Sequence, residues 1–266
     1  MDLKIQPVDI DENQYNRAKH SLWEFPSAHL ILGKIKSGKS TLLHNMISKL
    51  WTPVFDDRVI LFSPSCGDPI IRDLIDNDKL FYHSETFSMD ALETILSIIK
   101  SEEDDPTKAG RRWLVVIDDA MGSINHSINS YEGRRFCKMY ASFRHMYGEG
   151  KITIVMAIQK FIGAVSPVVR ANLHYVYLLG KASEKEIKDM SEELNAIAGG
   201  DSKKFTETYH RIKSGNPYNF AFLDFNRMVM MRNFDTVMYS ADHGEFSDDE
   251  GEDGEEVVIP EEEGGK

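Results

Sequence analysis

The residues Gly33–Ser40, "GKIKSGKS", decide how the rest of this sequence is interpreted. They follow a short apolar run, "HLIL" at 29–32, and precede a stretch of helical character, "STLLHNMISKLW" at 40–51. The pattern G-x-x-x-x-G-K-[ST] between a strand and a helix is typical of a loop that binds a phosphate chain. Glycines let the backbone approach the phosphates, and the positive end of the following helix favours an anion. The sequence therefore predicts a loop that binds a nucleoside triphosphate.

Within this loop, two side chains have specific expected tasks. Lys39 would reach the β- and γ-phosphates, and the Ser40 hydroxyl would ligate Mg²⁺. The other predicted nucleotide contacts are Gly33, Lys34, Ile35, Lys36, Ser37, Gly38 and Thr41. Of these, Lys34 and Ile35 would contribute backbone amides. The charge of Lys36 would face either the phosphates or a neighbouring subunit, and both alternatives stay open.

A pair of acids ends the apolar run "WLVVIDDA" at 113–120. We expect Asp118 to hold the metal through water, and Asp119 to polarise the water that attacks the γ-phosphate. An aspartate after a strand also commonly caps the next turn, which is the alternative for one of the two. The position of the pair, at the end of a strand downstream of the phosphate loop, favours the catalytic interpretation.

Three further polar residues are candidates for the same site. The run "ITIVMAIQ" ends in Gln159, whose amide would sense phosphate or orient water if its strand lies beside the strand of the phosphate loop. An ordinary polar strand end explains Gln159 equally well. Arg144 precedes this run and Arg170 follows it, and phosphoryl transfer gains from an arginine supplied across a subunit interface. Most arginines, however, are solvated or structural.

The pattern of apolar runs predicts an α/β fold. Strand-like runs alternate with helical patterns up to residue 180, which favours a mostly parallel central sheet with helices on both faces. The expected strands are 29–32, 58–64, 79–83, 112–119, 151–159 and 174–180, and the expected helices are 40–51, 89–100 and 134–147. Residues 182–213 indicate two more helices, split by Gly199 and Gly200. The runs "YNFAFLDF" and "MVMMRNF" then predict an antiparallel hairpin that extends one sheet edge.

The charge is distributed unevenly along the 266 residues. The formal net charge is −12, but the segment 242–266 alone holds 12 acidic residues and one lysine. The rest of the chain is therefore close to neutral, so the net charge does not exclude nucleic acid as a partner. The acidic segment has too few apolar residues to order itself, and we expect it to aid solubility or bind a partner. We predict a lead-in at 1–27, one domain at 28–240 and a disordered tail at 241–266.

Two further observations bear on location. The two cysteines are far apart and form no CxxC, so neither a disulfide framework nor a zinc site is expected. No apolar run approaches the roughly 18 residues that a membrane span needs, and the N-terminus is too polar for a signal peptide. We therefore expect a soluble, intracellular protein; if it is viral, we expect it in the host cytoplasm and in the virion.

Taken in order, the motifs resemble those of the FtsK/HerA superfamily of P-loop ATPases. The quoted segments are "GKIKSGKST", "WLVVIDDA", "FRHMYGEG", "ITIVMAIQK" and "SPVVRANL", and the resemblance covers roughly residues 28–182. Within the superfamily they look most like the compact DNA-packaging ATPases of poxviruses and other large double-stranded DNA viruses. Two features depart from the pattern: Asp119 stands where many related ATPases have glutamate, and the acidic tail is not part of it.

The resemblance implies a RecA-like fold with additional strands, assembly into a homo-oligomeric ring, and ATP- and Mg²⁺-dependent translocation of double-stranded DNA into a capsid. It implies that Gln159 senses the nucleotide and that Arg144 is the finger from a neighbouring subunit, with Arg170 as the second candidate. Capsid or portal proteins would be further partners. Arg134, Arg135 and Lys138 are candidates for pore contacts with DNA, although a solvated helix face explains them as well.

Several rival functions stay open. A HerA-like DNA-processing helicase or translocase fits the same motifs. A small GTPase would explain the D-x-x-G at 119–122, but the guanine-specific N-K-x-D is missing from the segment where it should follow. A nucleotide kinase would need clustered arginines in a lid, and the adjacent pairs at 111–112 and 134–135 lie in no evident lid. An ATP-gated binding module with weak turnover is the last alternative.

Overall fold

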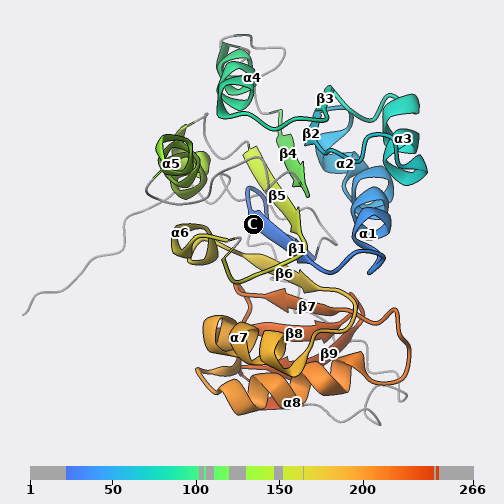
Figure 1. Ribbon diagram of the computed structural model, residues 1–266, viewed down its shortest axis with the longest axis vertical. Helices are drawn as coiled ribbons and strands as arrows, with labels where there is room; N and C mark the ends of the chain where they lie inside the picture. The colour runs from blue at the N-terminus through green and yellow to red at the C-terminus, as the bar shows by residue number, and fades with distance from the viewer. Residues whose placement is uncertain are drawn as a thin grey trace, which may run out of the picture. The chain divides into compact units, whose positions relative to one another are not determined.

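The computed structural model describes residues 22–101, 105, 111–119, 130–146, 152–163, 165–242 and 244–245. The chain forms two compact units, which divide after Leu179. We describe each unit by itself, because each has its own sheet pattern and its own helices (Figure 1).

The first unit is built on a parallel sheet. Its strands lie in the order β6-β1-β5-β4-β2-β3, and each neighbouring pair is parallel. Their bounds are β1 (Ala28–Leu32), β2 (Val59–Phe62), β3 (Tyr82–Ser84), β4 (Trp113–Asp118), β5 (Ile152–Ile158) and β6 (Tyr175–Leu178). Five of these strands match the predicted runs to within about two residues at each end, whereas β3 shares only Tyr82 and His83 with the run predicted at 79–83.

Helices cover both faces of this sheet, which is why five of its strands are buried along their whole length. Every residue of β1, β2, β4, β5 and β6 is buried, as expected for strands covered on both sides. The helices are α1 (Lys39–Asn45), α2 (Thr52–Phe55), α3 (Pro69–Asp76), α4 (Met89–Ser101), α5 (Tyr131–Met146) and α6 (Pro167–Arg170). Figure 1 shows α1, α2 and α3 on one side of the strands, and α5 and α6 on the other.

Several local features differ from the sequence prediction, among them the short helices α2 and α6, which were not predicted. The helix predicted at 40–51 ends as an α-helix at Asn45 and continues as a π-helical segment, Met46–Leu50. Helix α3 was not predicted; Asp68 caps it by accepting a hydrogen bond from the Ile70 amide, and Pro69 opens its first turn.

The segment before β1, residues 22–27, packs on the first unit. Trp23 and Phe25 are buried, and the Trp23 indole donates to the Tyr177 hydroxyl at 2.7 Å. The Phe25 ring meets the rings of Trp51 and Phe55 edge-on, with centroids 5.9 and 5.1 Å apart. These contacts tie residues 22–27 to β6 and to the end of the first helical stretch.

The second unit combines two helices with antiparallel strands (Figure 1). Helix α7 (Glu184–Leu194) starts with a capping box formed by Ser183 and Glu186. A 3₁₀ turn, Asn195–Ala198, leads to α8 (Ser202–Lys213), which Asp201 caps. The strands are β7 (Ala221–Asp224), β8 (Val229–Arg232), β9 (Thr236–Ser240) and β10 (Gly244–Glu245), and successive strands pair antiparallel. The predicted hairpin is β7–β8, whereas β9 and β10 were not predicted.

The predicted fold class is confirmed: the protein is an α/β protein with a mostly parallel core and antiparallel strands near the C-terminus. The proposed division at residues 27 and 240 stays a prediction. The acidic stretch 246–266 lies outside the described residues, and so does the loop at 120–129. None of the helices in the described part of the chain is long and apolar enough to cross a membrane.

Candidate nucleotide-binding site

The order of the strands brings the sequence motifs together at one edge of the parallel sheet. Strand β1 lies beside β5, and β5 lies beside β4, so the segments after these strands are neighbours. The Gly33 amide donates to the Ile158 carbonyl at 3.1 Å, and the Asp119 amide donates to the Ala157 carbonyl at 2.9 Å. The condition for placing Gln159 near the loop, that β5 lies next to the phosphate-loop strand, is therefore met. Ligands of open α/β sheets bind at this carboxyl edge.

The loop after β1 has the backbone shape that its glycines allow. Gly38 has a φ of 95° and Lys36 a φ of 64°, both in the left-handed region. Gly33 has no room for a side chain, because a Cβ would clash with the Ser37 hydroxyl and come 3.1 Å from the Leu179 Cβ. The Ser37 Oγ is buried and has no hydrogen-bond partner among the described residues. Turned amides of this kind form an anion-binding concavity.

Lys39 begins helix α1 and points back into the loop. Only 6% of the residue is exposed, and its Nζ donates to the Gly33 carbonyl at 2.9 Å. The same Nζ lies 3.5 Å from Asp119 Oδ2. The first amides of the helix have no partner within it, so they can donate to phosphate oxygens. Ser40 is half-buried, and the exposed residues of the loop region are Lys34, Ile35, Lys36 and Thr41.

Asp118 is a buried acid at the end of β4, with 2% of its surface exposed. Its Oδ2 accepts a hydrogen bond from the Ser63 hydroxyl at 2.8 Å. Burial raises the pKa of Asp118 to about 6, and the Ser63 hydrogen bond and the Lys39 charge oppose this rise. Because burial makes the charge of this carboxylate costly, a bound metal ion would stabilise its ionised form.

Asp119 and Gln159 form a second pair beside Lys39. The Gln159 Nε2 donates to Asp119 Oδ2 at 3.0 Å, and that oxygen also faces the Lys39 ammonium. Asp119 has a φ of 45°, a left-handed conformation that aspartate tolerates better than most residues. The backbone therefore favours the short acid at the position where the related motif has glutamate.

The residues present fit ATP and Mg²⁺. The loop offers a glycine cradle, helix amides and the unpartnered Ser37 hydroxyl, and Asp118 offers a carboxylate next to Lys39. The described residues contain no cluster of three or more histidine, cysteine or acidic side chains that would hold a metal by itself. Mg²⁺ usually binds through one or two protein groups together with phosphates and water, and Ser40 and Asp118 would be those protein groups.

The two candidate arginines lie in different places: Arg144 is away from this edge, whereas Arg170 contacts the segment that follows β5. Burial is the main cause that lowers the pKa of His174 to about 4, and the nearby charge of Arg144 on α5 acts in the same direction. His174 precedes β6 and donates through its amide to the Ala28 carbonyl, so Arg144 lies at the opposite edge of the sheet. Arg170 on α6 donates from Nη1 to the Val165 carbonyl at 3.1 Å.

One of the suggested DNA contacts has a different task. Arg135 on α5 forms ion pairs with Asp90 Oδ1 at 2.7 Å and Glu93 Oε2 at 2.5 Å, both on α4. These pairs join two helices, so the interpretation of Arg135 as a pore contact is less well supported than that of Lys138, which is exposed. No local sequence pattern indicates this pairing, because the acids lie more than 40 residues from Arg135 along the chain.

Comparisons with known proteins agree with this geometry at the level of the fold. No family model matches the chain, and no curated protein does. Among solved structures, the chain is similar to the genome-packaging NTPase B204 from Sulfolobus turreted icosahedral virus 2 in complex with AMP. That match has a TM-score of 0.55 and 15% identity, and covers 77% of this chain and 96% of that chain.

Two other solved structures have a similar fold. B204, the DNA-packaging ATPase from Sulfolobus turreted icosahedral virus, matches with a TM-score of 0.55 and 15% identity over 78% of this chain and 97% of its own. The conjugation coupling protein TcpA of pCW3, with ATPγS, matches with a TM-score of 0.52 and 14% identity over 79% of this chain and 62% of its own. The chain therefore has the fold of P-loop ATPases.

Proposed function

We propose that this protein is an ATPase that moves double-stranded DNA, and that it packages a viral genome into a capsid. One observation carries the proposal: the strand order gathers the phosphate loop, the Asp118–Asp119 pair and Gln159 around the Lys39 ammonium. The similarity in fold to viral genome-packaging NTPases supports the choice of DNA as the partner. The poxvirus-like character suggested by the motifs is part of the same proposal.

Each residue of the site has a role in ATP hydrolysis. The loop amides and Lys39 bind the phosphate chain, and Ser40 and Asp118 hold Mg²⁺, which neutralises charge on the phosphates when bound. Asp119 accepts a proton from the water whose oxygen attacks the γ-phosphorus, while the bond to the ADP oxygen breaks. Gln159, already hydrogen-bonded to Asp119, orients this water or senses the γ-phosphate.

A ring of identical subunits would complete the site. Because Arg144 lies at the sheet edge opposite the phosphate loop, it cannot serve the site of its own chain, and it is available to that of a neighbour. Arg170 is tied to the Val165 carbonyl of its own chain, which makes it the second candidate. Transient grip on DNA needs only contacts to the phosphate backbone, so a near-neutral body suffices.

One alternative has a specific observation in its favour. The conjugation coupling protein TcpA has a similar fold, so the same site would also suit a DNA translocase that acts outside a capsid. Binding to a capsid or portal protein would separate the two proposals. The acidic tail is the natural candidate for the segment that makes this contact.

The test is nucleotide hydrolysis by the full chain. We expect ATP hydrolysis that needs Mg²⁺, rises with double-stranded DNA and is lost in Lys39→Ala, because Lys39 binds the phosphates. Lys49→Ala is a matched control, since it removes an exposed lysine that lies outside the loop. A preference for GTP, or transfer of phosphate to a nucleoside instead of water, would contradict the proposal.

A further inference from the structure

Ser63 is a residue that no sequence motif indicated, yet it occupies a central position at the carboxyl edge of the sheet. It follows β2 directly and is fully buried. Its amide donates to the Ser84 carbonyl at 2.9 Å, which fixes it to the neighbouring strand β3. Strand β2 also pairs with β4, so Ser63 lies beside Asp118.

The groups around the Ser63 hydroxyl determine where it donates its hydrogen bond. The Ser65 amide donates to Ser63 Oγ at 3.1 Å, so this contact uses the oxygen as an acceptor. The hydroxyl proton is then directed to Asp118 Oδ2, 2.8 Å away. A hydrogen bond to a charged acceptor in a buried setting is strong and orients both partners.

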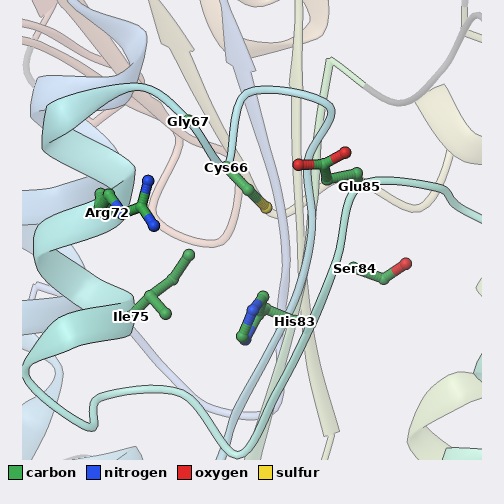
Figure 2. A pocket seen from close by; sticks show the side chains of 7 residues that line it. All are labelled: Cys66, Gly67, Arg72, Ile75, His83, Ser84 and Glu85. Carbon is green, nitrogen blue, oxygen red and sulfur yellow. The ribbon is translucent and has the colours of Figure 1, made fainter.

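The backbone carbonyl of Ser63 also takes part in a hydrogen bond. The Cys66 thiol donates to the Ser63 carbonyl at 3.1 Å. Cys66 also lines a pocket of about 360 Å³ between α3 and β3, together with Arg72 and His83 (Figure 2). The turn from Ser63 to Cys66 is therefore held at several points, and the hydroxyl has little freedom to leave Asp118.

The consequence lies in the Asp118 carboxylate. Its Oδ2 is occupied by Ser63, whereas Oδ1 accepts no hydrogen bond from the residues that the structure describes. We propose that Ser63 is a positioning residue for Asp118, fixing the rotation of the carboxylate so that Oδ1 remains for the Mg²⁺ of bound ATP. This inference rests on the proposed ATPase function. Hydrogen-bond partners of metal-binding groups commonly have this task.

The test measures metal affinity apart from turnover. Mn²⁺ is titrated into the full chain with a non-hydrolysable ATP analogue and followed by electron paramagnetic resonance, and nucleotide affinity is measured separately with the metal chelated. We expect Ser63→Ala to weaken Mn²⁺ binding by about 10- to 100-fold. Metal-free nucleotide affinity should stay unchanged, and Ser63→Thr, which keeps the hydroxyl, should restore metal binding.

Two controls make the result specific. Ser84→Ala removes a hydroxyl at the end of the adjacent strand, whose hydrogen bonds within the described part of the chain go to the Thr86 backbone, and it should leave Mn²⁺ affinity unchanged. In an Asp118→Asn background, Ser63→Ala should have no further effect on the metal, because its target is already changed. This second comparison keeps the test informative if Ser63→Ala lowers stability.

The outcomes separate this inference from the proposed function. If Ser63→Ala binds Mn²⁺ as the wild type does, or loses metal-free nucleotide affinity by the same factor, Ser63 is structural and the inference fails while the ATPase proposal stands. If the wild type shows no metal-dependent binding of the ATP analogue, the proposed function fails together with the inference.

Discussion

At the scale of one residue, the buried carboxylate of Asp118 lowers the stability of the folded protein at neutral pH. The pKa of about 6 in the folded protein exceeds the ordinary value of 3.8, so the folded state binds this proton more tightly than the unfolded state does. Stability therefore falls as the pH rises from about 4 to about 6, and the full penalty is present at neutral pH. Burial of the charge is the main cause.

Asp118→Asn should therefore stabilise the protein while removing its metal-binding acid. We expect the free energy of unfolding at neutral pH to rise by about 2 kcal/mol, since the neutral amide can still accept the Ser63 hydrogen bond. Denaturant unfolding at neutral pH and at about pH 4 measures the effect, which should disappear at the lower pH. The exposed Asp76→Asn is the control. If Asp118→Asn instead lowered the free energy of unfolding at neutral pH, the Asp118 charge would be stabilised by its neighbours and the prediction would be wrong.

At the scale of an element, the phosphate loop depends on a close approach that only glycine permits. Gly33→Ala would place its Cβ against Ser37 and 3.1 Å from the Leu179 Cβ, so the loop would have to shift. We expect the affinity for ATP to fall by at least about tenfold, in line with an overpacking cost of roughly 1–3 kcal/mol. Equilibrium binding of a fluorescent ATP analogue measures this.

Gly67→Ala is the matched control for this change, because a Cβ at Gly67 meets no atom within 4 Å. It should bind the nucleotide as the wild type does. Equal affinities for the two alanine variants would mean that the loop tolerates a side chain at Gly33, and the account of the loop would be wrong.

The elements also show why only part of the structure was predictable. Strands buried on both faces are continuous apolar runs, so β4 and β5 were evident in the sequence. Helix α3 was not predicted because it is short. Strand β9 was not predicted because it forms by pairing with β8, which no local sequence pattern encodes. The same reason hid Ser63: its role depends on β2 lying beside β4, which no local pattern encodes.

At the residue level, the phosphate loop and the Asp118–Asp119 pair were predictable because their spacing follows from the chemistry of phosphate and metal binding. The structure adds the contacts among them: Gln159 to Asp119, and Asp119 to Lys39. The roles of Arg144 and Arg170 stay predictions, since one chain does not contain the subunit interface that they would serve.

For the whole molecule, the proposed ring predicts that two different defects can compensate each other. Arg144→Ala should lower ATP hydrolysis by about 10³-fold or more, because the site of the neighbouring subunit would lose the arginine that stabilises the transition state. Mixing it with Lys39→Ala should restore part of the activity, since the intact loop of one subunit meets the intact arginine of the other. Arg170→Ala in the same assay tests the second candidate. Full activity in a strictly monomeric preparation, with both arginine variants unimpaired, would contradict the shared site.

The most direct test of the central claim is displacement of a triplex-forming strand from double-stranded DNA by the full chain. The account predicts ATP-dependent displacement by the wild type and none by Lys39→Ala, because movement needs hydrolysis at the phosphate loop. Displacement by Lys39→Ala at the wild-type rate, or ATP hydrolysis by the wild type without any displacement, would contradict it.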